Sequence, residues 1–248
     1  MISLKSKREI EIMAEAGQML KAVFEKVAPE IHPGITTQEL DVISEMTIRN
    51  AGGAPAFKGY RGFPGTSCIS VNEEVVHGIP GKRVLLDGDI VSVDCGVGLS
   101  GYFVDAARTW GVGKISTSKQ RLIDASKGAF FAGVQHYKSG HRIGDLSEAI
   151  QKYIESLGYQ VVRDFVGHGI GRAIHEDPQV PNYGKSGRGP KIQEGLCLAI
   201  EPMVTEGDYA VKILEDGWTV VTLDGSLSSH YEDTIAFVED RYINLTGS

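Results

Sequence analysis

The stretch VSVDCGVGLSGYFVDAART, residues 91–109, decides how the rest of the sequence is interpreted. Its apolar residues and central turn indicate a buried β-hairpin, and yet it contains Asp94 and Asp105. A hairpin that turns at Leu99-Ser100 would make the two aspartates direct cross-strand neighbours on one face. Carboxylates at that distance repel each other, and burying either is costly unless a shared proton or a metal cation compensates. We therefore predict a cation site, with a solvated surface hairpin as the alternative.

The composition narrows the class of protein. The chain has 248 residues, 42% of them hydrophobic and 23% charged, which suits a globular protein of one large domain or two small ones. A net charge of −7 without a basic run argues against a nucleic-acid binder. No apolar stretch approaches a membrane span, and the charged N-terminus differs from a secretory signal. Three cysteines without CxxC spacing are expected to be buried and reduced, and we predict a cytoplasmic location.

Helix and strand signals are both abundant, which predicts an α+β fold. Capping boxes at Ser6–Glu9 and Thr36–Glu39 begin two helices. Apolar spacing predicts two further helices at about 118–137 and 145–157. The strands are expected to be antiparallel or mixed. Short β-like runs lie at 67–71, 84–94, 101–110, 160–165, 196–204, 210–214, 218–223 and 230–238.

A faint internal repeat relates the two halves of the chain. PGITTQELDVISEMTIRNAG (33–52) resembles SGHRIGDLSEAIQKYIESLG (139–158). Further on, LDGDIVSVD (86–94) resembles QEGLCLAIE (193–201) in the same order. Any one of these similarities could arise by chance, but their shared order makes duplication the preferred explanation.

The repeat also pairs acidic residues, because Asp94 falls on Glu201 and Asp105 falls on or beside Glu232. A pseudo-twofold axis would point all four carboxylates at one central space. His168, within GHGIG, adds an imidazole, which suits iron(II), manganese, cobalt or zinc better than calcium or magnesium. Four carboxylates balance the charge of two such divalent ions. The alternatives are salt-bridged glutamates and a hydrogen-bonded core histidine; a phosphate loop is excluded because no GxGxxG pattern or Walker lysine is present.

This ordered set of five residues resembles the dinuclear metal site of the methionine aminopeptidases, which have the pita-bread fold. The segment F-x-G-H-G-I-G-x₃-H-x₄-V-x-N-Y, from Phe165 to Tyr183, is similar to the type I signature, and NEEVVHGIP (72–80) and LAIEPM (198–203) match as well. The resemblance covers essentially the whole chain, without the helical insertion of type II enzymes. It implies a central curved antiparallel sheet flanked by two helix pairs with an internal pseudo-twofold. It further implies a single catalytic domain, 1–248, with halves of about 1–112 and 113–248.

The resemblance implies a role for each metal ligand. Asp94 would chelate one of two divalent ions, Fe²⁺, Mn²⁺, Co²⁺ or Zn²⁺, and His168 with Glu201 would hold the other. Asp105 and Glu232 would bridge both ions. A water or hydroxide between the ions would be the nucleophile, and Glu201 would shuttle its proton.

The resemblance also identifies the remaining catalytic and substrate-binding residues. His175 would bind the scissile carbonyl oxygen and the developing oxyanion, and His77 would lie near the scissile nitrogen. Phe57 stands where a cysteine can occur and Ile174 where a phenylalanine can, which affects the shape of the pocket and not the chemistry. The other histidines, His230 among them, are expected at the surface. The methionine pocket would be apolar and formed by Tyr60, Phe63, Cys68, His77, Ile174 and Trp218.

The implied reaction is hydrolysis of the first peptide bond of nascent proteins, which releases N-terminal methionine when the second residue is small. A monovalent cation would be held by backbone carbonyls near Asn72 and Ser228. The implied partners are nascent polypeptide N-termini and, transiently, the ribosome, with no stable nucleic acid and no membrane. The family relationship favours a monomer.

Two alternatives use the same fold. One is a prolidase or Xaa-Pro aminopeptidase, which normally carries a further N-terminal domain and a different histidine segment. The other is a pita-bread relative that has lost catalysis and serves as a binding protein. Such relatives usually lose metal ligands, whereas all five are present in this sequence.

Overall fold

Both predicted capping boxes begin long helices in the computed structural model of the chain, which describes residues 1–247. The hydroxyl oxygen of Ser6 accepts a hydrogen bond from the backbone N–H of Glu9, whose carboxylate accepts one from the N–H of Ser6. Thr36 and Glu39 form the same pair. The α-helices are α1 (Lys7–Val27), α2 (Thr37–Asn50), α3 (Thr117–Val134) and α4 (Ile143–Ser156), with short 3₁₀ helices η1 (Ala28–Glu30) and η2 (Tyr60–Gly62).

A nine-stranded sheet forms the centre of the molecule, with the order β1-β4-β5-β14-β9-β7-β8; β2 also pairs with β4, and β15 with β14. Its strands are β1 (Ala54–Pro55), β2 (Ser67–Val71), β4 (Ile90–Leu99), β5 (Tyr102–Gly111), β7 (Gly167–Gly169), β8 (Glu176–Val180), β9 (Cys197–Ile200), β14 (Glu232–Val238) and β15 (Arg241–Asn244). Two three-stranded sheets, β13-β10-β6 and β11-β12-β3, lie beside it. They contain β3 (Glu74–Val76), β6 (Gln160–Val161), β10 (Met203–Thr205), β11 (Val211–Ile213), β12 (Val220–Thr222) and β13 (Ser228–His230). The pairings within the described residues are antiparallel, as predicted for the main sheet.

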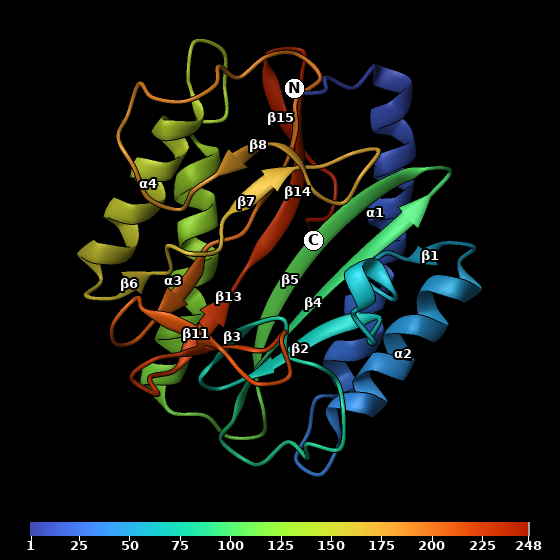
Figure 1. Cartoon of the computed structure of the whole chain (residues 1–248), viewed down its shortest axis with the longest axis vertical. Coiled ribbons are helices and arrows are strands. Elements are labelled where there is room, and N and C mark those ends of the chain that lie inside the picture. Colours follow the sequence, from blue (N-terminus) through green and yellow to red (C-terminus); the bar gives the residue numbers. More distant parts are fainter. Residues whose placement is uncertain (248) are drawn as a thin grey trace.

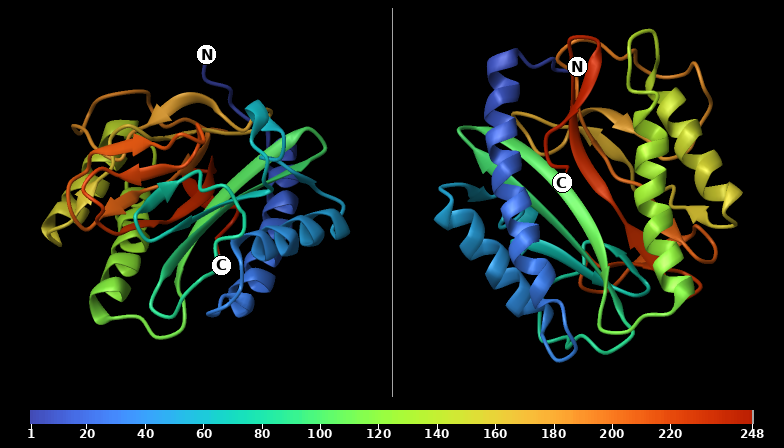
Figure 2. Two further views of the ribbon diagram at one scale, coloured as in Figure 1. Left: turned by 60° about the horizontal axis from the view of Figure 1, so that its bottom comes forward. Right: turned by 180° about the vertical axis from the view of Figure 1, so that it is seen from behind.

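Two helix pairs flank the curved sheet, as the resemblance implied. Figure 1 shows α1 and α2 at one side and α3 and α4 at the other. In the view from behind, α1 and α3 lie across the back of the sheet, with the C-terminus between them (Figure 2). Each pair has its own apolar core, around Leu20 and Leu40 in one and around Phe130 and Ile150 in the other. None of the helices within the described residues is long and apolar enough to cross a membrane.

The internal repeat of the sequence corresponds to repeated local structure. Gly34 and Gly140 precede α2 and α4 with φ angles of 101° and 81°. Gly52 and Gly158 follow the same helices with φ angles of 86° and 83°. Because residues with a Cβ rarely adopt these angles, each helix of the repeated unit is bounded by glycines at both ends. This agreement supports the predicted pseudo-twofold.

The hairpin that carries the two aspartates forms, but its predicted register is wrong by two residues. The turn lies at Ser100-Gly101, with φ angles of 49° and 82°, so Asp94 lies opposite Ala107 instead of Asp105. Two consecutive residues with positive φ match the twist of a two-residue hairpin turn, and glycine adopts this conformation without strain. The aspartates are therefore diagonal neighbours, and they still share one face of the sheet.

Other strand predictions are confirmed only in part. Within the predicted run 84–94, the strand β4 begins only at Ile90. Within the predicted run 160–165, only the two residues of β6 form a strand. Strands β1, β3, β7, β8 and β15 were not predicted. β7 consists of Gly-His-Gly and β8 contains a proline among charged residues, so neither shows the β-branched alternation that identifies a strand.

Gly17 in α1 gives a stability prediction. A Cβ at this position would lie 2.0 Å from the carbonyl oxygen of Leu245. The backbone of α1 therefore packs directly on the backbone of the C-terminal residues, with no room for a side chain between them. Gly→Ala in an exposed helix interior stabilises by up to about 1 kcal/mol. We expect Gly17→Ala instead to lower the free energy of unfolding by about 1–3 kcal/mol, because the new methyl group overpacks this contact. Urea denaturation measures the change.

The control for this prediction is Gln18→Ala, at the next and exposed position of α1, which should change the free energy of unfolding by less than about 0.5 kcal/mol. A Gly17→Ala variant as stable as the parent protein would contradict the close packing of α1 on Leu245.

Candidate metal centre and active site

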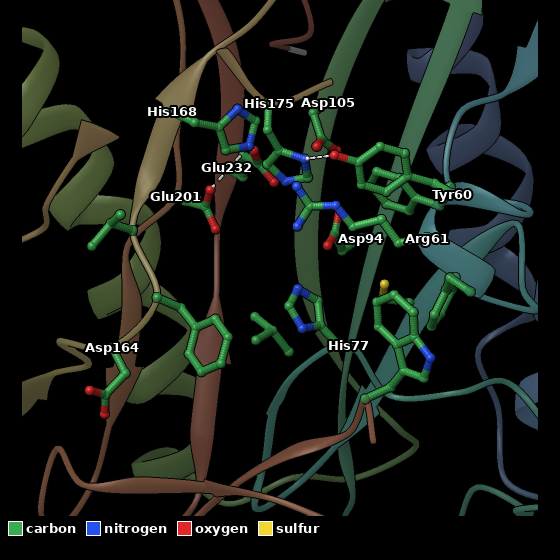
Figure 3. A pocket seen from close by; sticks show the side chains of 17 residues that line it. Tyr60, Arg61, His77, Asp94, Asp105, Asp164, His168, His175, Glu201 and Glu232 are labelled. Atoms are coloured by element: carbon green, nitrogen blue, oxygen red, sulfur yellow. Dashed lines mark hydrogen bonds and ion pairs between the residues drawn. The ribbon is translucent and has the colours of Figure 1, made fainter. Parts of the chain in front are cut away.

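The five predicted metal ligands lie on five consecutive neighbours in the sheet. Asp94 is on β4, Asp105 on β5 and Glu232 at the start of β14, whereas Glu201 directly follows β9 and His168 is the middle residue of β7. The sheet order β4-β5-β14-β9-β7 therefore places the five residues in a row across the sheet. Figure 3 shows their side chains converging on one space from both sides. Residues up to 138 positions apart in sequence meet here because of strand order and not because of local structure.

The ligand atoms are close together and buried. One oxygen each of Asp105 and Glu232 and one ring nitrogen of His168 all lie within 4.8 Å of one another. Nε2 of His168 is 3.4 Å from Oε1 of Glu201. Asp105 is 4% exposed and Glu232 is 2% exposed. All five residues, Asp94 included, line one cavity of about 300 Å³.

The carboxylates destabilise one another unless a cation is bound. Burial raises the pKa of Asp94 to about 7. Burial, followed by repulsion from nearby carboxylates, raises the pKa values of Asp105, Glu201 and Glu232 well above their ordinary range. Among the described residues, Oδ1 of Asp94, Oδ1 of Asp105 and Oε1 of Glu232 are buried without a hydrogen-bond partner. Carboxylate oxygens are good ligands for divalent cations. A buried set of them without hydrogen-bond donors therefore fits a divalent metal ion.

The tautomer and the neutral charge of the His168 ring suit it to bind a metal through nitrogen. Its Nδ1 lies 3.0 Å from the carbonyl oxygen of Gly169, which can only accept, so Nδ1 carries the proton. Nε2 is then left with a free lone pair facing the carboxylates. Burial lowers the pKa of His168 to about 4, which also favours the neutral ring. The backbone contact thus selects the tautomer that a metal needs.

Threonine side chains join β5 to β14 and to the end of β13 around the predicted metal ligands. The backbone ladder between β5 and β14 pairs only two residues of β14. On one side of it, the hydroxyl of Thr234 accepts from the N–H of Asp105 at 2.9 Å and donates to its carbonyl oxygen at 2.8 Å. On the other side, Thr109 makes the same two bonds with the backbone of His230. The spacing between Asp105 and Glu232 is therefore fixed by side chains as well as by the ladder.

Arg108 supports Glu232 from the opposite face of the sheet. Its guanidinium donates to the backbone carbonyl of Glu232 and, at 2.6 Å, to Oδ1 of the fully buried Asp233. It also lies 4.3 Å from the centre of the Tyr231 ring. These contacts fix the backbone from which the Glu232 carboxylate projects into the cavity.

The two predicted catalytic histidines border the metal ligands. The His175 ring is centred 4.4 Å from that of His168, and its Nδ1 is 3.0 Å from the hydroxyl of Tyr60. Burial, and then the charge of Arg61, lowers the pKa of His175. His77 has a left-handed backbone, with φ of 60°, and burial lowers its pKa to about 4. Both rings are therefore neutral near pH 7, and both can offer an N–H donor.

The predicted methionine pocket is a compact apolar cluster beside these histidines. Phe63, Cys68 and Ile174 are buried, and the ring of Trp218 meets that of Phe63 edge-on at 5.1 Å. The predicted pocket residues line the cavity with one exception: Ile174 packs in the cluster without lining the space. Lining residues that the sequence interpretation did not identify are Arg61, Val76, Asp164, Phe165 and Val166. Two of them lie inside the quoted signature, so that motif could have identified them.

His230 corrects one expectation. It was predicted at the surface, but it is 1% exposed, and its Nε2 lies 3.9 Å from Oε2 of Glu232. The backbone bonds from Thr109 draw this position into the sheet. Nothing in the local sequence distinguishes it from an exposed histidine. All three cysteines are buried and free, as expected.

Comparison with known proteins places this arrangement among relatives. The profile of metallopeptidase family M24 matches residues 11–239. Methionine aminopeptidase of Clostridium perfringens is 54% identical over 238 residues, covering 96% of each chain. Methionine aminopeptidase 1 of Bacillus subtilis is 49% identical and covers 99% of each chain. The crystal structure of methionine aminopeptidase from Thermotoga maritima superposes with a TM-score of 0.98 at 44% identity over the whole of both chains.

A more distant likeness concerns the fold alone. Prolidase from Pyrococcus furiosus superposes with a TM-score of 0.81 at 23% identity, and the match covers 99% of this chain but 65% of that one. The shared fold is the pita-bread arrangement of a curved antiparallel sheet and two helix pairs.

Proposed function

Because this chain belongs to metallopeptidase family M24 and to its type I methionine aminopeptidases, we propose that it removes N-terminal methionine from nascent proteins whose second residue is small. The enzyme is a metal-dependent aminopeptidase. One observation carries the assignment: four largely buried carboxylates and a neutral histidine converge from five neighbouring positions across the sheet, in one cavity with an apolar cluster.

The residues that would hold metal follow from the row across the sheet. Asp94 would hold one ion, His168 and Glu201 the other, and Asp105 and Glu232, between them, would be shared. Two ions, with Fe²⁺, Mn²⁺, Co²⁺ and Zn²⁺ as the candidates, match the charge of four carboxylates and the presence of an imidazole. When bound, such ions polarise a carbonyl group and lower the pKa of a coordinated water.

The protein groups around that centre bind the peptide and move protons. Glu201, whose carboxylate lies 3.4 Å from His168 within the ligand cluster, would take a proton from the attacking water and pass it to the leaving nitrogen. If the hydroxyl of Tyr60 donates to Nδ1 of His175, Nε2 of that ring carries the proton and donates to the carbonyl oxygen as negative charge develops there. His77, neutral and largely enclosed, is assigned to the scissile nitrogen.

The apolar cluster accounts for selection of methionine. Phe63, Cys68 and Trp218 offer sulfur and aromatic surface, which contacts a thioether favourably. Tyr60 and His77 line the same cavity. Ile174 packs against the apolar cluster without lining the cavity, so its size affects the shape of the pocket indirectly. An unbranched side chain of methionine length fits this lining better than a charged or short one.

Further features of the proposal concern the whole protein. Its partners are the N-termini of nascent chains, with a transient contact at the ribosome. It acts in the cytoplasm, as a monomer. The chain forms a single catalytic domain, 1–248, with halves of about 1–112 and 113–248. We assign the monovalent cation to backbone carbonyls near Asn72 and Ser228, two segments that are joined by a hydrogen bond from the N–H of Ser228 to the carbonyl oxygen of Asn72 at 2.9 Å.

Activity after chelation tests the proposed function. We expect EDTA to reduce turnover of Met-Ala-Ser by at least about 100-fold, because the nucleophile and the carbonyl polarisation both depend on the metal. Adding back each candidate ion separately should restore activity and rank the metals. A Xaa-Pro dipeptide is the control substrate, and it should remain intact.

The two alternatives predict other outcomes. Cleavage of Xaa-Pro in preference to Met-Ala-Ser would identify a prolidase-like enzyme. Stoichiometric metal uptake without turnover of either peptide would identify a binding protein.

A further inference from the structure

A short loop between β7 and β8 presents two of the residues assigned to the substrate, Ile174 and His175. The loop turns tightly, and the carboxylate of Glu176 closes it by accepting from the backbone N–H groups of Arg172 and Ala173 at 2.7 and 3.1 Å, both through Oε1. The position of the His175 ring therefore depends on where the Glu176 carboxylate is held. Its second oxygen, Oε2, is available for that purpose.

Lys5 holds this second oxygen from beneath the loop. Its Nζ donates to Oε2 of Glu176 at 2.5 Å and to the carbonyl oxygen of Ser3 at 2.9 Å. The Lys5 side chain is only 2% exposed, although lysine is rarely buried. The two partners are 171 positions apart in the sequence, so the pair joins the N-terminal segment directly to the active-site loop.

The surrounding backbone is shaped around Lys5. A Cβ at Gly171 would lie 2.1 Å from Cε of Lys5, and a Cβ at Gly195 would lie 2.3 Å from its carbonyl oxygen. The backbone N–H of Lys5 donates to the carbonyl oxygen of Gly195 at 2.7 Å. Lys5 is thus enclosed between the loop and the segment that precedes β9.

A second contact to the same loop is exposed and contributes less. The guanidinium of Arg172 donates to Oε1 of Glu9 at 2.8 Å, but the Arg172 side chain is 70% exposed. Exposed ion pairs fix geometry weakly. A buried pair adds little net stability compared with apolar packing, but it determines one arrangement where several would otherwise compete. Backbone hydrogen bonds hold the start of the loop, among them one from the N–H of Phe103 to the carbonyl oxygen of Gly171 at 2.7 Å. Of the two ion pairs to the loop, the enclosed Lys5–Glu176 pair is the one that can fix its later part, next to His175.

We propose that Lys5 is a positioning residue, which acts through Glu176 to place His175 against the substrate carbonyl. The inference rests on the proposed function, because it assigns Lys5 to the same reaction. It makes the N-terminal segment, far from the metal ligands in sequence, part of the support of the active site.

The test is Lys5→Met, which keeps the length of the side chain and removes its charge. We expect kcat for Met-Ala-Ser to fall about 10- to 100-fold, as a displacement of about 1 Å of a catalytic group produces, with KM within about threefold. In a His175→Ala background the same substitution should change kcat by less than about twofold, because the group that it positions is gone. Lys7→Met is the matched control, since Lys7 is 67% exposed and forms an ion pair with the exposed Glu239.

A second variant keeps the test decisive if Lys5→Met folds poorly. Lys5→Met/Glu176→Gln leaves no unpaired buried charge, and the amide oxygen can still accept from the loop, but nothing holds its far side. We expect this variant to fold and to keep kcat at least about fivefold below the parent protein. Parental kcat in either variant, or an equal loss in the His175→Ala background, would overturn the positioning role. An inactive parent protein would instead refute the proposed function.

Discussion

Asp105→Asn is expected to abolish turnover, lowering kcat/KM for Met-Ala-Ser by at least about 10³-fold. Asp105 lies between Asp94 and Glu232 in the row of ligands and contributes an oxygen to the tightest group of ligand atoms. The amide is nearly isosteric, so the backbone bonds to Thr234 should persist. What is lost is the negative charge shared by both proposed metal positions. Calorimetric titration with Mn²⁺ should show reduced stoichiometry alongside the loss of activity.

Without metal, the variant should fold at least as well as the metal-free parent protein, because one buried carboxylate no longer repels its neighbours. This separates a defect of metal binding from a defect of folding. Asp124→Asn is the control, since Asp124 is exposed on α3 and its carboxylate accepts a hydrogen bond from the side chain of Gln120. Parental turnover by a folded Asp105→Asn protein would be incompatible with the proposed centre.

His175→Ala should give the second largest effect, a loss of about 10² to 10³-fold in kcat. The ring borders His168 and is oriented by Tyr60, so its N–H is placed where charge develops on the carbonyl oxygen. Because that interaction strengthens only in the transition state, KM should change by no more than about threefold. Steady-state kinetics on Met-Ala-Ser separates the two parameters.

Tyr60→Phe provides a graded comparison, because it removes only the hydroxyl that contacts Nδ1 of His175. We expect a loss of about tenfold or less in kcat, corresponding to one hydrogen bond. The exposed His32 serves as a neutral control through His32→Ala. A His175→Ala enzyme that raised KM and kept kcat would assign the ring to substrate affinity and remove it from the chemical step.

The helices and the repeat were predictable because their signals are local. A capping box such as Ser6–Glu9 is a contact within four residues, and it appears in the structure as the sequence indicates. The paired glycines around α2 and α4 are equally local. The repeat also paired four carboxylates, of which three lie on strands and Glu201 directly follows one. The family resemblance supplied the roles of the ligands.

Features that depend on distant partners were less accessible. The hairpin register is wrong by two residues because the alternation of side chains fixes a face and not a partner, and only the left-handed pair Ser100-Gly101 decides the turn. Strands β7 and β8 are recognisable only from the strands beside them. The burial of Lys5 depends on Glu176, and that of His230 on Thr109, so neither could be inferred from neighbouring residues.

The boundary between the two proposed halves passes through the proposed metal site. β4 and β5 come from the first half, whereas β14, β9 and β7 come from the second, and the threonine bonds close the junction at Asp105. Neither proposed half contains all five proposed ligands, so the proposed site exists only where the two halves meet. A symmetric dimer whose subunits were joined into one polypeptide would give the same arrangement. Such a fusion would free each side to diverge, and of the five proposed ligands the imidazole of His168 comes from the second half.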